Sequence, residues 1–90
     1  MISGILPEDP VRNSVNLAAV NAAVNGFVKA AALELGNGVR INAVSPGVVE
    51  DAPQLFEMFP GHKPVSMERV VFAYRKSVLG HITGEVIKEF

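Results

Sequence analysis

Near the middle of the chain the sequence reads Val39-Arg40-Ile41-Asn42-Ala43-Val44-Ser45-Pro46-Gly47. Its first six residues, 39–44, are rich in β-branched side chains and end at a Ser-Pro-Gly turn, which is typical of a β-strand. A long helical pattern precedes this strand, and a loop follows it. Helix, strand and loop in this order indicate a βαβ crossover unit, so the sequence predicts an α/β domain with a parallel sheet.

The preceding helix is predicted from about Asn13 to Leu35, with Asn13 or Ser14 as its cap and Gly36 with Gly38 at its end. Large apolar residues recur on one face at helical spacing; they are Leu17, Val20, Val24, Phe27, Val28, Ala31 and Leu35. A second stripe is small and consists of Ala19, Ala23, Gly26 and Ala30. We expect the bulky face to lie on the sheet. The small face either packs closely against another helix or reflects the helix preference of Ala.

Downstream, residues 50–64 hold three prolines among several apolar side chains, which indicates a loop. Such a loop either covers a pocket or folds back on the core. A second helix is predicted from Ser66 to Gly80. Its apolar stripe is Met67, Val70, Val71, Tyr74 and Val78. Residues 85–90 read as a terminal strand, and residues 1–2 read as the end of an earlier one.

Composition excludes several classes of function. A net charge of -1 with scattered signs offers no basic surface for nucleic acid or anionic lipid. The chain has no Cys, and His62 and His81 lie far apart without other clustered ligands, so we expect no metal site. No apolar stretch reaches the roughly 18 residues that span a membrane. The amino terminus lacks the features of a signal peptide, and we expect a cytoplasmic protein.

Three segments together resemble the carboxyl-terminal half of the short-chain dehydrogenase/reductase family. Residues 22–35 look like its active-site helix, residues 39–47 resemble its sixth strand and Pro-Gly turn, and residues 82–87 are similar to its Thr-Gly turn into the last strand. The resemblance implies that residues 1–90 form part of a Rossmann-like, doubly wound parallel sheet, from the end of the fifth strand to the last strand. The Gly-rich turn that binds the pyrophosphate in the amino-terminal half is absent from this sequence. We therefore expect a fragment of a longer protein.

The resemblance also implies where catalytic residues should stand. In the family a Ser orients the substrate carbonyl, a Tyr donates a proton, and a Lys four residues later lowers the pKa of that Tyr. These positions fall on Ser3, Leu17 and Asn21, and the chain contains no Tyr-x-x-x-Lys, since its single Tyr is Tyr74. Loss of a positioned general acid typically lowers the rate by about 10² to 10⁴. Ser3 is either the retained serine or a turn hydroxyl bonded to backbone.

The cofactor implied by the resemblance is NAD or NADP, bound by the full-length protein. Its expected contacts are Asn21, Pro46, Gly47, Val48, Val49 and Asp51. Asp51 replaces a Thr that usually meets the nicotinamide carboxamide. Together with Glu50 it would repel the cofactor phosphates if both carboxylates faced inward, whereas both are harmless if they point to solvent.

Three functions follow as expectations. The first is an NAD(P)-dependent oxidoreductase acting on a small carbonyl or alcohol, with a degenerate catalytic motif and an inactive isolated chain. The second is a non-catalytic cofactor-binding or dimeric scaffold, with a homo-oligomer formed through the 13–35 helix. The third is a free-standing interaction domain, which would leave an open sheet edge. We expect a small-molecule partner and neither nucleic acid nor membrane.

Overall fold

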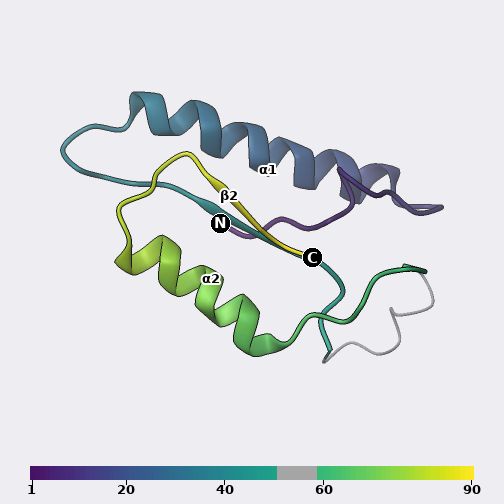
Figure 1. Ribbon diagram of the computed structural model, residues 1–90. Helices are drawn as coiled ribbons and strands as arrows, with labels where there is room; N and C mark the ends of the chain where they lie inside the picture. The colour runs from purple at the N-terminus through teal and green to yellow at the C-terminus, as the bar shows by residue number, and fades with distance from the viewer. Residues whose placement is uncertain (51–58) are drawn as a thin grey trace.

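Two helices and two strands make up the computed structural model, which describes residues 1–50 and 59–90. Their order is α1 (Val15–Glu34), β1 (Ala43–Pro46), α2 (Met67–Leu79) and β2 (Val86–Glu89). The strands pair in parallel, with Ala43 opposite Val86 and Pro46 opposite Glu89. The two helices lie on opposite sides of the strands (Figure 1). The predicted α/β, Rossmann-like arrangement is confirmed.

The amino-terminal segment extends the sheet on the other edge of β1. Ile2 forms a parallel bridge with Val44. The amide of Ser3 donates to the carbonyl of Val44 at 2.9 Å, and the amide of Val44 donates to the carbonyl of Met1 at 2.9 Å. β1 therefore lies between residues 1–3 and β2, as expected if residues 1–2 end a strand.

The main core lies between the strands and α2. It consists of Val44, Val65, Val70, Ala73 and Ile87, with Val49 and Ile82 packed against it. On the opposite side of the strands, Val28 is the buried residue of α1 and has no exposed surface. No helix in the described ranges is long and apolar enough to cross a membrane.

The expectation that the bulky face of α1 lies on the sheet is wrong for most of its members. Leu17, Val20 and Phe27 are each more than half exposed. The inward row is narrower and partly polar; its members are Ala18, Asn21, Val24, Asn25, Val28, Ala31 and Ala32. The described sheet is narrow, so it covers one row of helix residues and leaves the flanking large side chains uncovered.

The stripe predicted for α2 needs a similar correction. Val70 is buried as expected, but Val71, Tyr74 and Val78 are exposed, and the second buried residue of α2 is Ala73. Position 73 faces the sheet because it lies three residues after Val70, and a small side chain there lets the helix approach the strands closely.

The helix ends follow the sequence with one exception. Ser66 caps α2, and its side chain accepts a hydrogen bond from the amide of Arg69 at 3.2 Å. Gly80 ends α2 at a place where a Cβ would lie 2.5 Å from the carbonyl oxygen of Lys76. Ser14 occupies the cap position of α1, but its hydroxyl is bonded to the backbone of Val11 rather than to a helix amide.

The strand predicted for residues 39–44 begins later, at Ala43. The residues before it anchor α2 instead. The guanidinium of Arg40 donates to the carbonyls of Ser77, Val78 and Ile82 at 2.7, 3.0 and 3.1 Å. It thereby satisfies carbonyls at the carboxyl end of α2 that have no partner within the helix.

Asn42 makes the equivalent connection from a buried position. Its side-chain amide donates to the hydroxyl of Ser77 at 3.2 Å and to the carbonyl of Ile82 at 3.0 Å. Its carbonyl oxygen accepts from the amide of Glu85 at 3.1 Å. One side chain thus ties the start of β1 to the end of α2 and to the turn before β2.

We expect Asn42→Ala to lower the free energy of unfolding by about 2 kcal/mol, because three partly buried hydrogen bonds are lost and a cavity replaces a buried side chain. Urea unfolding followed by circular dichroism measures this change. Asn16→Ala, at an exposed position of α1, is the matched control and should change stability by less than about 0.5 kcal/mol. Equal effects of the two substitutions would contradict the anchoring role of Asn42.

Candidate functional site

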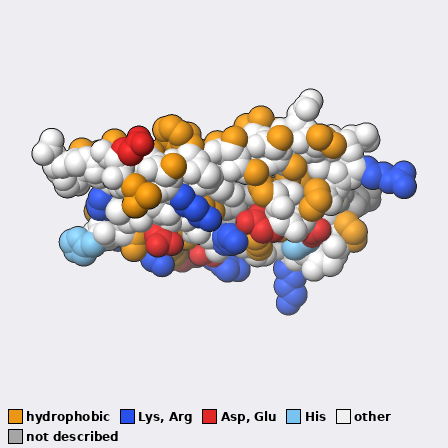
Figure 2. Space-filling view, turned by 90° about the horizontal axis from the view of Figure 1, so that it is seen from above, with side chains coloured by type: hydrophobic (Ala, Val, Ile, Leu, Met, Phe, Trp, Pro, Cys, Tyr) orange, Lys and Arg blue, Asp and Glu red, His pale blue; other side chains and the backbone are white. Residues whose placement is uncertain are grey.

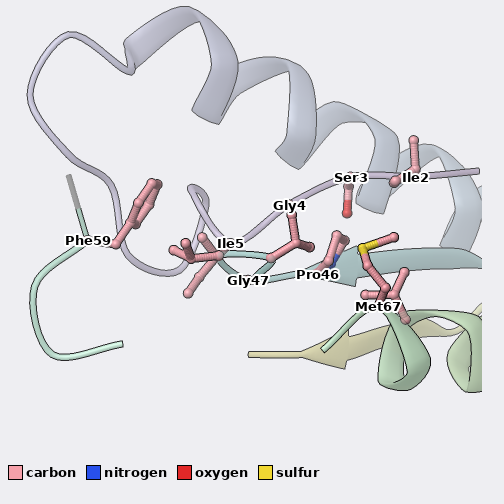
Figure 3. Close-up of a pocket in the computed structure, with 11 residues that line it drawn as sticks. Ile2, Ser3, Gly4, Ile5, Pro46, Gly47, Phe59 and Met67 are labelled. Carbon is pink, nitrogen blue, oxygen red and sulfur yellow. The ribbon is translucent and has the colours of Figure 1, made fainter. Parts of the chain in front are cut away.

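A pocket of about 390 Å³ lies where the amino-terminal segment and β1 end. It is lined by Ile2, Ser3, Gly4, Ile5, Pro46, Gly47, Val48, Val49, Phe59, Met67 and Val70. Figure 3 shows Phe59 at one end, Met67 toward the other, and Gly4 and Gly47 between them. Ligands of open α/β sheets bind at the carboxyl ends of the parallel strands, which is where this pocket lies.

Ser3 is part of the pocket wall. Its hydroxyl oxygen is buried and has no hydrogen-bond partner among the described residues. The alternative of a turn hydroxyl bonded to backbone is therefore not what the structure contains. A buried hydroxyl without a partner is unfavourable by about 1–3 kcal/mol, so this oxygen would gain from a bond to a bound group.

Ser45 fixes the segment that carries Ser3. Its side chain is fully buried, and its hydroxyl donates to the carbonyl of Gly4 at 2.9 Å. Gly4 also lies close to α1, because a Cβ at this position would lie 3.0 Å from the side-chain nitrogen of Asn21. The amino-terminal segment is thus held between β1 and α1.

The predicted cofactor contacts after β1 are brought together. Pro46, Gly47, Val48 and Val49 all line the pocket. The amide of Gly47 donates to the carbonyl of Glu89 at 2.7 Å. A Cβ on Gly47 would lie 3.0 Å from the backbone of Phe90, so this turn passes close to the end of β2. The predicted contact Asp51 and most of the predicted loop lie outside the described residues.

The positions of the catalytic pair lie beside the pocket rather than in it. Asn21 is partly buried on the inward row of α1, next to Gly4. Leu17 lies one turn earlier and is 60% exposed. Packing in an apolar cluster of the described residues therefore does not explain why a leucine stands at this position. The segment that carries Ser3 lies next to α1 at Asn21, and the catalytic roles of these positions stay a prediction.

Sequence reasoning missed part of the wall. Ile5, Phe59, Met67 and Val70 come from three separate segments. Met67 and Val70 had a signal, since they belong to the apolar stripe predicted for α2. Phe59 belonged to the apolar loop, but nothing in the order of residues placed it opposite Ile5.

Charged groups lie around the site rather than in its wall. His62 contacts the carboxylate of Asp9, and the ring of Phe59 meets the ring of His62 edge-on. Lys88 pairs with Glu8 at 3.2 Å. In the described ranges no group of His, Asp and Glu residues is arranged to hold a metal ion. The site offers a hydroxyl, backbone groups and an apolar wall.

The two serines give a matched test of this geometry. We expect Ser45→Ala to lower the free energy of unfolding by about 1–2 kcal/mol, because it leaves the Gly4 carbonyl unpaired. Ser3→Ala should leave stability unchanged or raise it, because it removes a hydroxyl with no partner. Urea unfolding of both variants measures the difference. A larger loss for Ser3→Ala than for Ser45→Ala would contradict the assigned hydrogen bonds.

The chain is similar to a known family over most of its length. The sequence model of the family described as enoyl-(acyl carrier protein) reductase matches residues 2–71. Comparison with curated proteins returned no match. Comparison with solved structures returned many, three of which follow.

The protein lin1944 from Listeria innocua is 41% identical to this chain with a TM-score of 0.94, and the match covers 99% of this chain and 45% of that one. A small-chain dehydrogenase is 31% identical with a TM-score of 0.76, covering 98% and 40%. Acetoin dehydrogenase YohF from Salmonella typhimurium is 25% identical with a TM-score of 0.72, covering 97% and 38%.

The chain therefore spans less than half the length of each of these relatives. The matched segment runs from the strand carrying Ser3 through the pocket and into α2. Three observations agree: the family match, the parallel strands flanked by helices, and the 41% identity over nearly the whole chain. The chain belongs to the short-chain dehydrogenase/reductase family.

Proposed function

We propose that the full-length protein binds NAD or NADP and acts on a small carbonyl or alcohol at the pocket that Ser3 lines. The observation that carries this proposal is the pocket at the carboxyl ends of the parallel strands, where Ser3 meets residues 46–49. The family relation supports the reaction class, an oxidation or reduction with a nicotinamide as hydride carrier.

The residues present fit the nicotinamide end of such a cofactor. Gly47 keeps the turn after β1 free of a side chain, and residues 46–49 line the pocket beside it. Asn21 carries a carboxamide that can hydrogen-bond a ribose hydroxyl from the position beside Gly4. The chain itself supplies no Gly-rich turn for the pyrophosphate, so we assign that contact to the other half of the full-length protein.

In the proposed reaction the bound nicotinamide supplies or accepts the hydride. The hydroxyl of Ser3 holds the substrate oxygen, and the apolar wall excludes water from the reacting carbon. Leu17 has no proton to donate, and Asn21 has no charge with which to lower the pKa of a neighbouring group. In the proposed reaction water then supplies the proton in the reduction and accepts it in the oxidation, and we expect slow turnover.

Cofactor binding is the direct test of this function. NADH and NADPH are titrated separately into the full-length protein up to millimolar concentration, and fluorescence or calorimetry reports binding. We expect at least one of the two to bind. The absence of any binding signal from either nucleotide would sink the proposal.

The missing acid gives a gain-of-function test. We expect the double variant Leu17→Tyr with Asn21→Lys to raise kcat/KM by at least about tenfold on a panel of small ketones that includes acetoin, because it restores a general acid and its neighbouring cation. The matched control is Lys29→Tyr with Leu33→Lys, two exposed positions at the same spacing on α1 that lie outside the pocket and outside the row of small residues. Equal rates in the two double variants would count against the assigned catalytic positions.

A non-catalytic dimeric scaffold is a second candidate, which the outer surface of α1 favours. Ala19, Ala23, Gly26 and Ala30 are all exposed there, and a Cβ on Gly26 would meet nothing within 4 Å. Hydrophobic side chains recur along this side of the molecule (Figure 2). A flat row of small residues lets a second helix approach closely.

The scaffold candidate predicts that Gly26→Leu weakens self-association of the full-length protein, because a leucine separates the two helices. Light scattering coupled to size exclusion measures the mass. Gly36→Leu is the control, since it is also exposed with open space around it but lies outside α1. An unchanged mass in Gly26→Leu would remove this helix as the interface.

A further inference from the structure

The chemistry of the pocket wall is unusually uniform. Its side chains from Ile2, Ile5, Val48, Val49, Phe59, Met67 and Val70 are apolar, as is the ring of Pro46. Among the described residues, the hydroxyl of Ser3 is the polar side-chain group of the wall. A ligand in this space would meet hydrocarbon on most of its surface and one polar anchor.

Positive charge is absent from the described wall of the pocket. All eight Lys and Arg residues of the sequence lie within residues 1–50 and 59–90, and none of them lines the pocket. Arg69, next to the lining residue Val70, pairs with Glu89 at 2.8 Å. Arg40 is bonded to three carbonyls at the end of α2.

The remaining charges near the site do not favour an anion. His62 is held by the carboxylate of Asp9. Residues 51–58, which lie outside the described ranges, hold two acidic residues and no basic one in the sequence. Burial of a carboxylate or phosphate against hydrocarbon is strongly unfavourable unless a cation or several donors compensate it.

We propose that this pocket selects an uncharged, predominantly apolar carbonyl or alcohol and rejects the acid analogue of the same shape. The inference rests on the proposed function in one respect, the use of the pocket as the substrate site. It adds the class of substrate, since a volume of about 390 Å³ suits a small ligand. The hydroxyl of Ser3 binds the carbonyl or hydroxyl oxygen at the reacting carbon of that ligand.

The test compares two probes that differ in charge. Methyl 4-oxocyclohexanecarboxylate and the free 4-oxocyclohexanecarboxylate share the ring and the ketone. Each is titrated into the full-length protein, with and without saturating NADH or NADPH, and ligand-observed NMR gives its Kd. We expect the ester to bind at least about fivefold more tightly than the acid. A smaller ratio, or the absence of binding by both probes, overturns the proposal.

A positive charge placed in the wall should weaken the preference for the ester over the acid. Met67 lines the pocket and is 37% exposed, so a lysine is tolerated there. Met67→Lys should lower the ester-to-acid affinity ratio by at least about fivefold. Leu79→Lys, at an exposed position on the same helix outside the pocket, should leave it within about twofold. If Met67→Lys does not fold, Ile2→Lys places the charge from the amino-terminal segment, where the lining residue is 57% exposed.

The two proposals fail in different ways. Absent cofactor binding with a retained ester preference would refute the dehydrogenase function and leave the pocket chemistry standing. Cofactor binding with equal or stronger binding of the acid would refute the uncharged-substrate inference alone. An unchanged affinity ratio in a folded Met67→Lys or Ile2→Lys variant would also refute it.

Discussion

β1 is hydrogen-bonded on both of its edges, and the rest of the structure depends on this pairing. On one edge it meets residues 1–3 through Val44, and on the other it meets β2 in parallel register. Parallel strands need a crossover between them, and α1 and α2 supply the two crossovers on opposite faces of the sheet (Figure 1). Because all three segments run in the same direction, their carboxyl ends meet at one place, and the pocket forms there.

Side chains of β1 and of the residues just before it form hydrogen bonds that hold the neighbouring segments in place. Asn42 and Arg40 hold the end of α2, while Ser45 holds the carbonyl of Gly4. These buried hydrogen bonds would leave costly unpaired groups if the strands shifted register. Two glycines permit the closest approaches, Gly4 beside Asn21 and Gly47 beside the backbone of Phe90. The hydrogen bonds and the two close approaches together tie the segments around the pocket to one another.

The proposed function separates binding from chemistry by the groups that each would need. Binding of a planar ring against Gly47 and Val48 would depend on shape and on backbone groups at the end of β1. Proton transfer needs a titratable group within reach, and neither Leu17 nor Asn21 has one. Under the proposal, the two requirements therefore rest on different residues. The apolar wall would favour neutral ligands without assisting a proton transfer.

The sequence by itself determined the α/β class, the order of the elements, most element boundaries and the absence of a Tyr-x-x-x-Lys motif. These features follow from local patterns: β-branched runs, helical spacing, and caps such as Ser66. The family resemblance predicts functional roles for Ser3 and residues 46–49, and these residues line one pocket in the structure. Tertiary structure alone decided which side chains face inward, because burial depends on what lies opposite. The inward row of α1 contains Asn21 and Asn25, whereas Leu17 and Phe27, which were predicted to face the sheet, are exposed. Tertiary structure also brought Phe59 and Met67 to the wall of the pocket. The spacing of residues along the sequence does not specify such a contact, because the packing of the whole sheet and its two helices sets the distance between the segments.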